Sequence, residues 1–128
     1  MPRARRSTHV LKPRLRVLDG DTIVLGPGKA DLLATIARDG EIRAAAKRLG
    51  MSYMRAWTLL REMNRAFGQP LVETSRGGRS HGRASLTPLG KRVLVLYREM
   101  ERRARAGAAP AWSKMHRLLR SRGKSRNT

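Results

Sequence analysis

The stretch EIRAAAKRLGMSYMRAWTLLREMN, residues 41–64, predicts two helices joined by a tight turn. Residues 41–49 place small and apolar side chains on one helical face, where neighbouring alanines let another helix approach closely. Gly50 allows the left-handed backbone that a sharp helix exit needs, and Ser52 is a residue type that caps the next helix. We expect that helix to run from about residue 53 to 67. Its predicted apolar stripe consists of Ala56, Leu60, Met63 and Phe67.

This order of helix, glycine-containing turn and helix is typical of a helix-turn-helix, in which the start of the second helix enters the major groove of DNA. A helical hairpin without a DNA role would show the same periodicity. Arg55 is the candidate for a bidentate contact to guanine, and Tyr53 suits a phosphate or a thymine methyl group. Trp57 adjoins the apolar stripe, so we expect it to pack in the core. The predicted contacts on the two helices are Arg43, Lys47, Ser52, Tyr53, Met54, Arg55 and Thr58.

The charge of the chain favours the DNA-binding interpretation. Among 128 residues, 29 lysines and arginines stand against 9 acidic residues, which gives a formal charge of +20. All the acids lie between Asp19 and Glu101, so both ends of the chain are purely basic. A charge of this size repels itself and calls for a polyanionic partner. Double-stranded DNA is the first candidate and an anionic membrane surface the second.

Several classes of protein are disfavoured by composition. The chain has no cysteine, which excludes disulfides, zinc fingers and thiol nucleophiles. Its three histidines are scattered and its acids are unpaired, so we predict no enzyme, no metal and no cofactor. No apolar run approaches the roughly 20 residues that span a bilayer, and the N-terminus lacks the apolar region of a secretory signal. We therefore expect a cytoplasmic, nucleoid-associated protein without stable membrane association.

Two elements are expected before the helix pair. Residues 15–26 have β-branched and apolar residues on either side of an Asp-Gly turn signal, which predicts a short hairpin or a single strand with a turn. Residues 26–40 follow with apolar side chains at helical spacing and Gly40 at the end. The GPGK at 26–29 lacks the spacing of a phosphate-binding loop and has Ala30 where serine or threonine is required. We interpret it as a turn before a helix.

Two strand candidates follow, LVET at 71–74 and ASLT at 84–87, and they bracket a segment rich in glycine and arginine. A cationic hairpin tip beside a recognition helix is typical of the wing of a winged helix, which reaches phosphates or the minor groove. A solvated loop is the alternative interpretation. The predicted wing contacts are Arg76, Arg79, Ser80, His81 and Arg83.

A long helix is predicted next, over residues 86–107, with Thr87 as its N-cap and Pro88 at its first position. At about 20 residues it would be some 30 Å long, more than a small winged helix needs. We therefore expect a homodimer through Leu89–Met100, although capping of its own domain would also explain the apolar stripe. That stripe consists of Leu89, Val93, Leu96 or Tyr97, and Met100.

The two ends of the chain are expected to differ from the middle. Residues 1–13 predict a basic, disordered arm and 108–128 a basic, partly disordered tail, which leaves 14–107 as the DNA-binding domain. In the tail, Pro110 is expected to open a short amphipathic helix that packs on the dimer, touches phosphates or meets a membrane. The expected fold class is mainly α with a small β-hairpin, a winged helix-turn-helix with a long C-terminal helix. The apolar face of the tail helix would hold Trp112, Met115 and Leu119.

The segment from about Gly20 to Arg103 resembles the N-terminal DNA-binding domain of the ModE family, the molybdenum-responsive bacterial transcription regulators. The resemblance rests on GMSYMRAW leading to EMN, then LVET with a glycine-rich tip, then LTPLG. A weaker likeness to LysR-type regulators covers the same span. The resemblance implies a winged helix that dimerises partly through its long helices, with Ser52–Thr58 as recognition segment and Arg76–Arg83 as wing.

Full-length ModE regulators also carry molybdate-binding modules, and the short segment after the long helix is too small to form one. The resemblance therefore implies a single-domain relative in which molybdate sensing does not carry over. We expect a transcription regulator that binds double-stranded DNA with sequence preference. The alternative is a non-specific architectural protein of the nucleoid.

Overall fold

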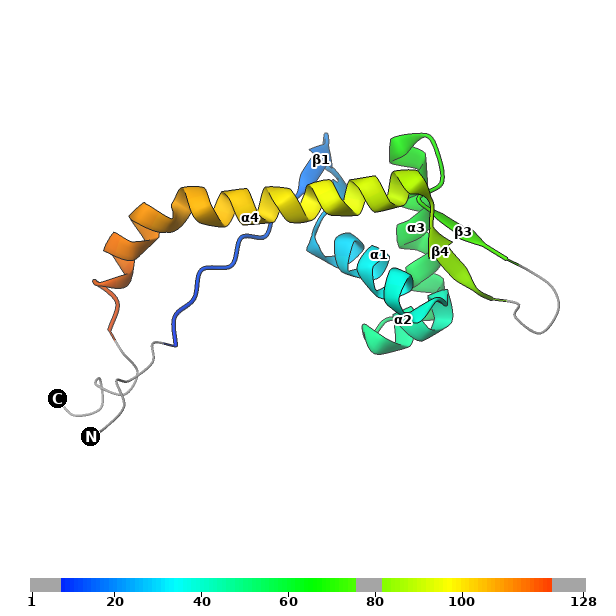
Figure 1. Ribbon diagram of the computed structural model, residues 1–128, viewed down its shortest axis with the longest axis horizontal. Helices are drawn as coiled ribbons and strands as arrows, with labels where there is room; N and C mark the ends of the chain where they lie inside the picture. The colour runs from blue at the N-terminus through cyan, green and yellow to red at the C-terminus, as the bar shows by residue number, and fades with distance from the viewer. Residues whose placement is uncertain (1–7, 76–81, 121–128) are drawn as a thin grey trace. The chain divides into compact units, whose positions relative to one another are not determined.

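The computed structural model describes residues 8–75 and 82–120, and Figure 1 shows its helices and strands. The chain divides into two compact units, one of residues 14–100 and one that combines residues up to 13 with those from 101 onward. Both sheets are two-stranded and antiparallel, β1 with β2 and β3 with β4. The elements are β1 (Val17–Asp19), β2 (Thr22–Leu25), α1 (Pro27–Asp39), α2 (Ile42–Arg48), α3 (Tyr53–Phe67), β3 (Val72–Thr74), β4 (Ala84–Leu86) and α4 (Pro88–His116).

The first element is a hairpin, which decides between the two forms that the sequence allowed. Gly20 at its tip has φ +62°, a left-handed conformation that glycine adopts without a steric penalty. The strand residues near the tip are exposed, and burial increases along β2 until Leu25 is buried. The hairpin therefore joins the core at its base while its tip stands in solvent.

The core of residues 14–100 lies between α1, α2 and α3. Gly50 has φ +72°, so the left-handed helix exit predicted there is confirmed, and Gly40, predicted to end the helix before it, has φ +76°. Ala45 and Ala46 are buried, as close helix packing requires. The core residues on these three helices are Ala30, Leu32, Leu33, Ile36, Ile42, Ala45, Ala46, Ala56, Leu59, Leu60 and Met63.

One residue of the predicted stripe on α3 is placed differently. Phe67 is 36% exposed, because it is the last residue of α3 and the chain turns away at Gly68. Leu59, which the predicted stripe omitted, is buried. A helix with 3.6 residues per turn buries both i+3 and i+4 neighbours, so the buried face of α3 is wider than a single line.

The base of the wing is formed by β3 and β4, whose pairs are Val72 with Leu86 and Thr74 with Ala84. The polypeptide then enters α4, where the Thr87 hydroxyl accepts a hydrogen bond of 3.0 Å from the Gly90 backbone N–H. Thr87 is thus the N-cap, as predicted, with Pro88 as the first helical residue.

The start of α4 packs on the core through three positions. Gly90 is buried against the backbone of Leu71, and Val93 and Tyr97 follow at helical spacing on the same side. The sequence left Leu96 and Tyr97 as alternatives for this stripe. The structure buries Tyr97, and it leaves Leu96 and Met100 exposed.

The last helix is longer than the sequence predicted. The expected end near residue 107 and the separate helix opening at Pro110 are wrong, because α4 continues through Pro110 to His116. A proline inside a helix removes one backbone hydrogen bond, and the alanines around it favour the helix on both sides. Leu119, expected on that second helix, lies beyond the end of α4.

Three rings meet in the second unit. Trp112 and His116, one helical turn apart on α4, stack with centroids 5.1 Å apart, and His9 meets His116 edge-on at 6.2 Å. Within residues 8–75 and 82–120, no helix is both long and apolar enough to cross a membrane.

Candidate nucleic-acid interface

The turn between α2 and α3 fixes the start of α3 at the surface. The backbone N–H of Met51 donates to the Ala46 carbonyl, at 2.9 Å, which closes the end of α2. The Ser52 hydroxyl accepts a hydrogen bond of 2.9 Å from the Arg55 N–H, so Ser52 caps α3 as predicted. The first turn of α3 is therefore held at both the backbone and the cap, and its side chains are free to face a partner.

The outward line of α3 lies opposite its buried face. Met54, Thr58, Arg61 and Arg65 stand at i, i+4, i+7 and i+11, and helical spacing puts them on the side away from the core. Met54 is 72% exposed. The Thr58 hydroxyl donates to the Met54 carbonyl at 3.0 Å, so it is paired within α3. A line of this kind, exposed and basic, has the form of a recognition surface.

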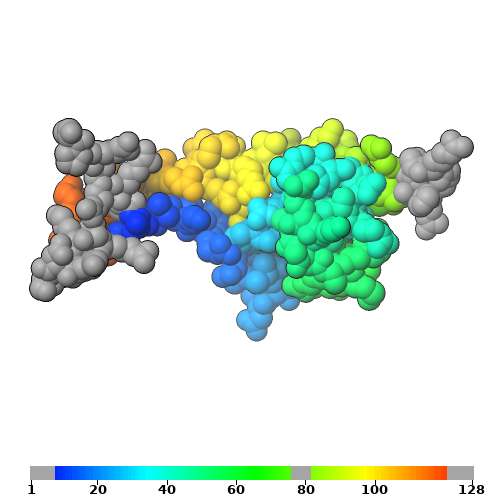
Figure 2. Space-filling view, turned by 90° about the horizontal axis from the view of Figure 1, so that it is seen from below, coloured from blue at the N-terminus to red at the C-terminus, as the bar shows by residue number. Residues whose placement is uncertain are grey.

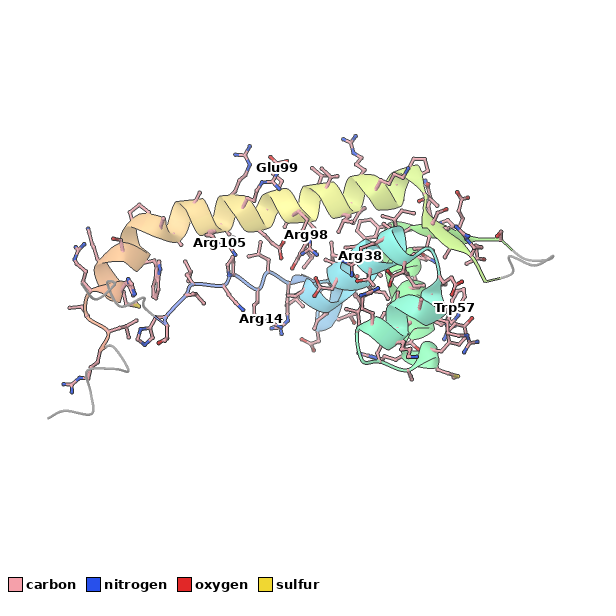
Figure 3. The ribbon with its side chains drawn as sticks, turned by 60° about the horizontal axis from the view of Figure 1, so that its bottom comes forward. Arg14, Arg38, Trp57, Arg98, Glu99 and Arg105 are labelled. Carbon is pink, nitrogen blue, oxygen red and sulfur yellow. The ribbon has the colours of Figure 1, made fainter. Side chains whose placement is uncertain are left out.

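An aromatic flank borders this line on the α2 side. The guanidinium carbon of Arg43 lies 4.2 Å from the centre of the Tyr53 ring, within cation–π range. Tyr53 in turn meets Trp57 edge-on, with centroids 6.3 Å apart. Trp57 is half-buried and packs against the core, as predicted, and Figure 3 labels it on α3. Arg43 of α2 and Tyr53, the first residue of α3, are thus held together beside the turn.

A groove borders α3 on its other side, between α3 and the β1–β2 hairpin. It has a volume of about 410 Å³. Figure 2 shows the hairpin (blue) against the helical body (cyan to green). At the bottom of the groove, the buried Lys29 ammonium donates to the Ile23 carbonyl and pairs with Glu62 at 3.0 Å. The groove is lined by Arg14, Arg16, Asp21, Thr22, Ile23, Gly26, Pro27, Gly28, Lys29, Arg55, Leu59 and Glu62.

A comparison with protein families identifies this arrangement. Residues 29–91, from the first turn of α1 to the start of α4, match the family model described as bacterial regulatory helix-turn-helix protein, lysR family. Residues 29–91 are therefore similar to the helix-turn-helix domain of the LysR family. The match includes α2, the turn and α3, and it ends just after the wing strands.

Curated relatives include the ModE regulators that the sequence resemblance predicted. The chain is 36% identical over 103 residues to molybdenum-pterin-binding protein MopB of Rhodobacter capsulatus, which covers 80% of this chain and 37% of the relative. It is 42% identical over 71 residues to the DNA-binding transcriptional dual regulator ModE of Escherichia coli, which covers 56% of this chain and 27% of that protein. The resemblance to ModE is therefore confirmed, and the chain spans well under half the length of these relatives.

The fold of this chain is also seen in a solved structure. Vibrio fischeri DarR, in complex with DNA, superposes with a TM-score of 0.52 at 20% sequence identity, over 70% of this chain and 29% of that one. This similarity supports the predicted winged helix-turn-helix fold.

The wing of the domain is described only at its base. Arg76, Arg79, Ser80 and His81 lie outside the described residues. Arg83 is exposed at the start of β4, where its carbonyl accepts a hydrogen bond of 3.0 Å from the Ser75 N–H. The Arg83 guanidinium lies over Gly40, and the Ala84 N–H donates to the Gly40 carbonyl at 2.8 Å. Arg83 thus joins the wing to the start of the helix-turn-helix.

Lys47 lies apart from the first turn of α3, in a hollow where α1 and α2 end. Arg48 donates to both carboxylate oxygens of Asp39, at 2.8 and 3.2 Å. This hydrogen bond, together with the positive charges of Arg48 and Arg38, holds the pKa of Asp39 below its ordinary value of 3.8. The single acid of the hollow is therefore ionised, and Arg38, Lys47 and Arg48 leave it with a net positive charge.

The structure brings most of the predicted contacts together and adds others. Of the seven predicted helix-turn-helix contacts, five lie at Ser52 or on the first two turns of α3, and Arg43 packs on the Tyr53 ring. Lys47 lies in the separate hollow. Arg61 and Arg65 were missed, although their spacing from Met54 signals the same face. Arg14 and Arg16 were missed because only the folded chain brings them to α3. Within the described residues, no group of three or more His, Asp or Glu side chains is arranged to hold a metal.

Proposed function

We propose that this chain is a transcription regulator that binds double-stranded DNA with sequence preference, with α3 in the major groove. The observation that carries the proposal is the outward line of α3, which is exposed and basic beside a capped, rigid first turn. The family match and the printed function of the ModE relative support the same activity. The wing residues Arg76–Arg83 would contact phosphates or the minor groove beside it.

Individual residues take roles that follow from their chemistry. Arg61 on the outward line and Arg55 at its edge each have the planar fork that pairs with guanine O6 and N7. Met54 offers an apolar contact to a thymine methyl group. The Ser52 cap leaves the backbone N–H groups of the first turn close to a phosphate. Arg43, held on the Tyr53 ring, is positioned for the DNA backbone.

Selection of preferred sites from a random duplex pool tests the proposal. A sequence-preferring regulator enriches one motif, and the selected duplex competes far better than random DNA. Neutralising six to ten phosphates gives a slope of log K against log salt near −5 to −9. Arg61→Ala and Arg55→Ala are each expected to cost about 1–3 kcal/mol on the selected duplex. An arginine whose loss weakens selected and random duplexes equally contacts phosphate rather than a base.

The partner arrangement that we propose is a homodimer through α4. Leu96 and Met100, one turn apart, are exposed on α4 next to the buried Val93 and Tyr97. A second copy that covers these side chains removes apolar surface from water. Two recognition helices would then meet sites about 34 Å apart along DNA. Sedimentation should show a dimer that Leu96→Glu with Met100→Glu dissociates, whereas Lys91→Glu, exposed on the opposite side of the same helix, leaves it intact.

A non-specific architectural protein remains the second candidate, and the +20 charge with basic chain ends favours it. Competition separates the two functions. A ratio of affinities near one between selected and random duplexes supports the architectural protein, and a large ratio supports the regulator.

A further inference from the structure

The groove between the β1–β2 hairpin and α3 presents two basic side chains that the helix-turn-helix does not use. Arg14 and Arg16 precede β1, and Figure 3 labels Arg14 on this part of the chain. Both side chains are exposed, and both line the same groove as Arg55 of α3. We propose that this groove seats a backbone phosphate of the duplex that α3 reads, held by Arg14 and Arg16.

The local backbone explains why both arginines reach the same groove. In an extended chain, alternate side chains point to opposite sides, so Arg14 and Arg16 share one side and Leu15 the other. Leu15 packs against the core. The buried Tyr97 hydroxyl also donates a hydrogen bond of 2.7 Å to the Leu15 carbonyl. Because Leu15 is held from α4, the two arginines are directed away from the core at a fixed point of the chain.

The charges in the groove favour an anion. Four basic and two acidic side chains line it. Lys29 and Glu62 pair with each other at 3.0 Å, so their charges compensate within the lining. Within the described residues, Arg14 and Arg16 form no ion pair, and Asp21 is the remaining acid of the lining. The groove therefore holds uncompensated guanidinium groups, which bind phosphate with two parallel hydrogen bonds.

The position of the groove favours a phosphate of DNA over a free anion. Arg55 belongs both to the groove and to the first turn of α3, so a duplex engaged by α3 passes directly beside Arg14 and Arg16. Binding a phosphate of this duplex costs no further translational entropy, because α3 already holds the duplex. The inference rests on the proposed function, and it adds the chain before β1 as a contact element separate from α3 and the wing.

A charge-removal experiment on the full chain tests the inference. The probes are a labelled duplex of random sequence and the duplex obtained by selection. Arg14→Gln with Arg16→Gln should weaken both by a similar factor, on the order of tenfold for each lost contact at 0.1 M salt, and should make the salt slope shallower by roughly 1 to 2. Lys91→Gln with Arg92→Gln removes the same charge from exposed positions on α4 and is the matched control.

Three outcomes are distinct. Suppose that the affinity of the wild type falls steeply with salt, and that the Arg14/Arg16 variant matches the Lys91/Arg92 control in affinity and in salt slope. The inference then fails and the proposed function stands. If the wild type binds neither duplex, the proposed function fails and the inference with it. Arg14→Lys with Arg16→Lys keeps both charges and should keep most of the slope. A lysine variant as weak as the glutamine variant would overturn the assignment to charge.

A second measurement locates the phosphate. Single methylphosphonates, which are uncharged, replace each backbone phosphate of the selected duplex in turn. At the position that occupies the groove, the replacement should weaken the wild type but cause little further loss in the Arg14→Gln, Arg16→Gln variant. If the replacement costs the same in both proteins at every position, no phosphate sits between Arg14 and Arg16.

Discussion

The Tyr97 hydroxyl on α4 donates a hydrogen bond of 2.7 Å to the backbone carbonyl of Leu15, 82 residues earlier in the chain. Tyr97 is 1% exposed, so its ring is packed in the core while its hydroxyl reaches the chain that enters the hairpin. Arg98, the next residue of α4, pairs with Asp31 of α1 at 3.0 Å. Adjacent residues of α4 therefore hold both the start of the domain and its first helix.

Tyr97→Phe is expected to destabilise the protein by about 1 kcal/mol, because the Leu15 carbonyl loses its hydrogen-bond donor while the ring still fills its site. Urea unfolding followed by circular dichroism measures the change. Tyr53→Phe, at an exposed ring, is the control and should change stability by less than about 0.5 kcal/mol. Equal effects of the two substitutions would show that the Leu15 contact contributes no stability.

Gly90→Ala is expected to be among the most destabilising single changes in the domain. A Cβ at Gly90 would lie 2.0 Å from the Leu71 carbonyl oxygen, so the base of the wing or the start of α4 must shift. Overpacking of this kind typically costs about 1–3 kcal/mol.

Gly107→Ala on the same helix is the matched control, since a Cβ at Gly107 meets nothing within 4 Å. It should stabilise the helix by roughly 0.5–1 kcal/mol through the higher helix propensity of alanine. Thermal unfolding of the two variants should therefore move the midpoint in opposite directions. A Gly90→Ala protein as stable as the wild type would mean that α4 and Leu71 are not in close contact.

Ser52→Ala should cost about 1 kcal/mol of stability, because the Arg55 N–H loses the hydroxyl that caps α3. Ser52→Asp restores a cap of similar strength but adds a negative charge where we propose a phosphate. The aspartate variant should unfold like the wild type and bind duplex more weakly than the alanine variant. Unfolding and binding titrations on the three proteins separate the two roles. Equal binding by the aspartate and alanine variants would place the cap away from DNA.

The Asp39–Arg48 pair is expected to give stability that depends on pH. The pKa of Asp39 is lower in the folded protein than its ordinary value of 3.8, so the contribution is present above that value and is lost as the pH falls through the folded pKa. Urea unfolding of the wild type and Asp39→Asn should differ near pH 6 and converge in the acid range. A difference that stays constant down to pH 2 would contradict the assignment.

Local patterns predicted the helix-turn-helix well. The bounds of α3, the Ser52 cap and the left-handed glycines at 40 and 50 all follow from short-range rules, because caps and helix exits depend on a few neighbouring residues. The homology to ModE was equally visible, since it lies in contiguous motifs. The wing strands were placed within a residue or two.

Features that depend on distant parts of the chain could not be predicted. Leu96 and Tyr97 are neighbours on α4, and the buried Tyr97 has its hydroxyl partner at Leu15, far away in sequence. Pro110 usually marks a helix boundary, and only the favourable residues around it let α4 continue. The groove at Arg55 combines the chain before β1, the start of α1 and α3, so no single stretch of sequence contains it.

The enclosure of Lys29 has a chemical consequence. The Lys29 side chain is 6% exposed, and its ammonium is held by Glu62 and the Ile23 carbonyl, whereas Lys12, Lys47, Lys91 and Lys114 are exposed. Reagents that acylate amines should therefore modify those four lysines first and reach Lys29 only when the hairpin separates from α3. The rate at which Lys29 becomes labelled would then measure the rate of that local opening, and mass spectrometry can follow it without any engineered probe.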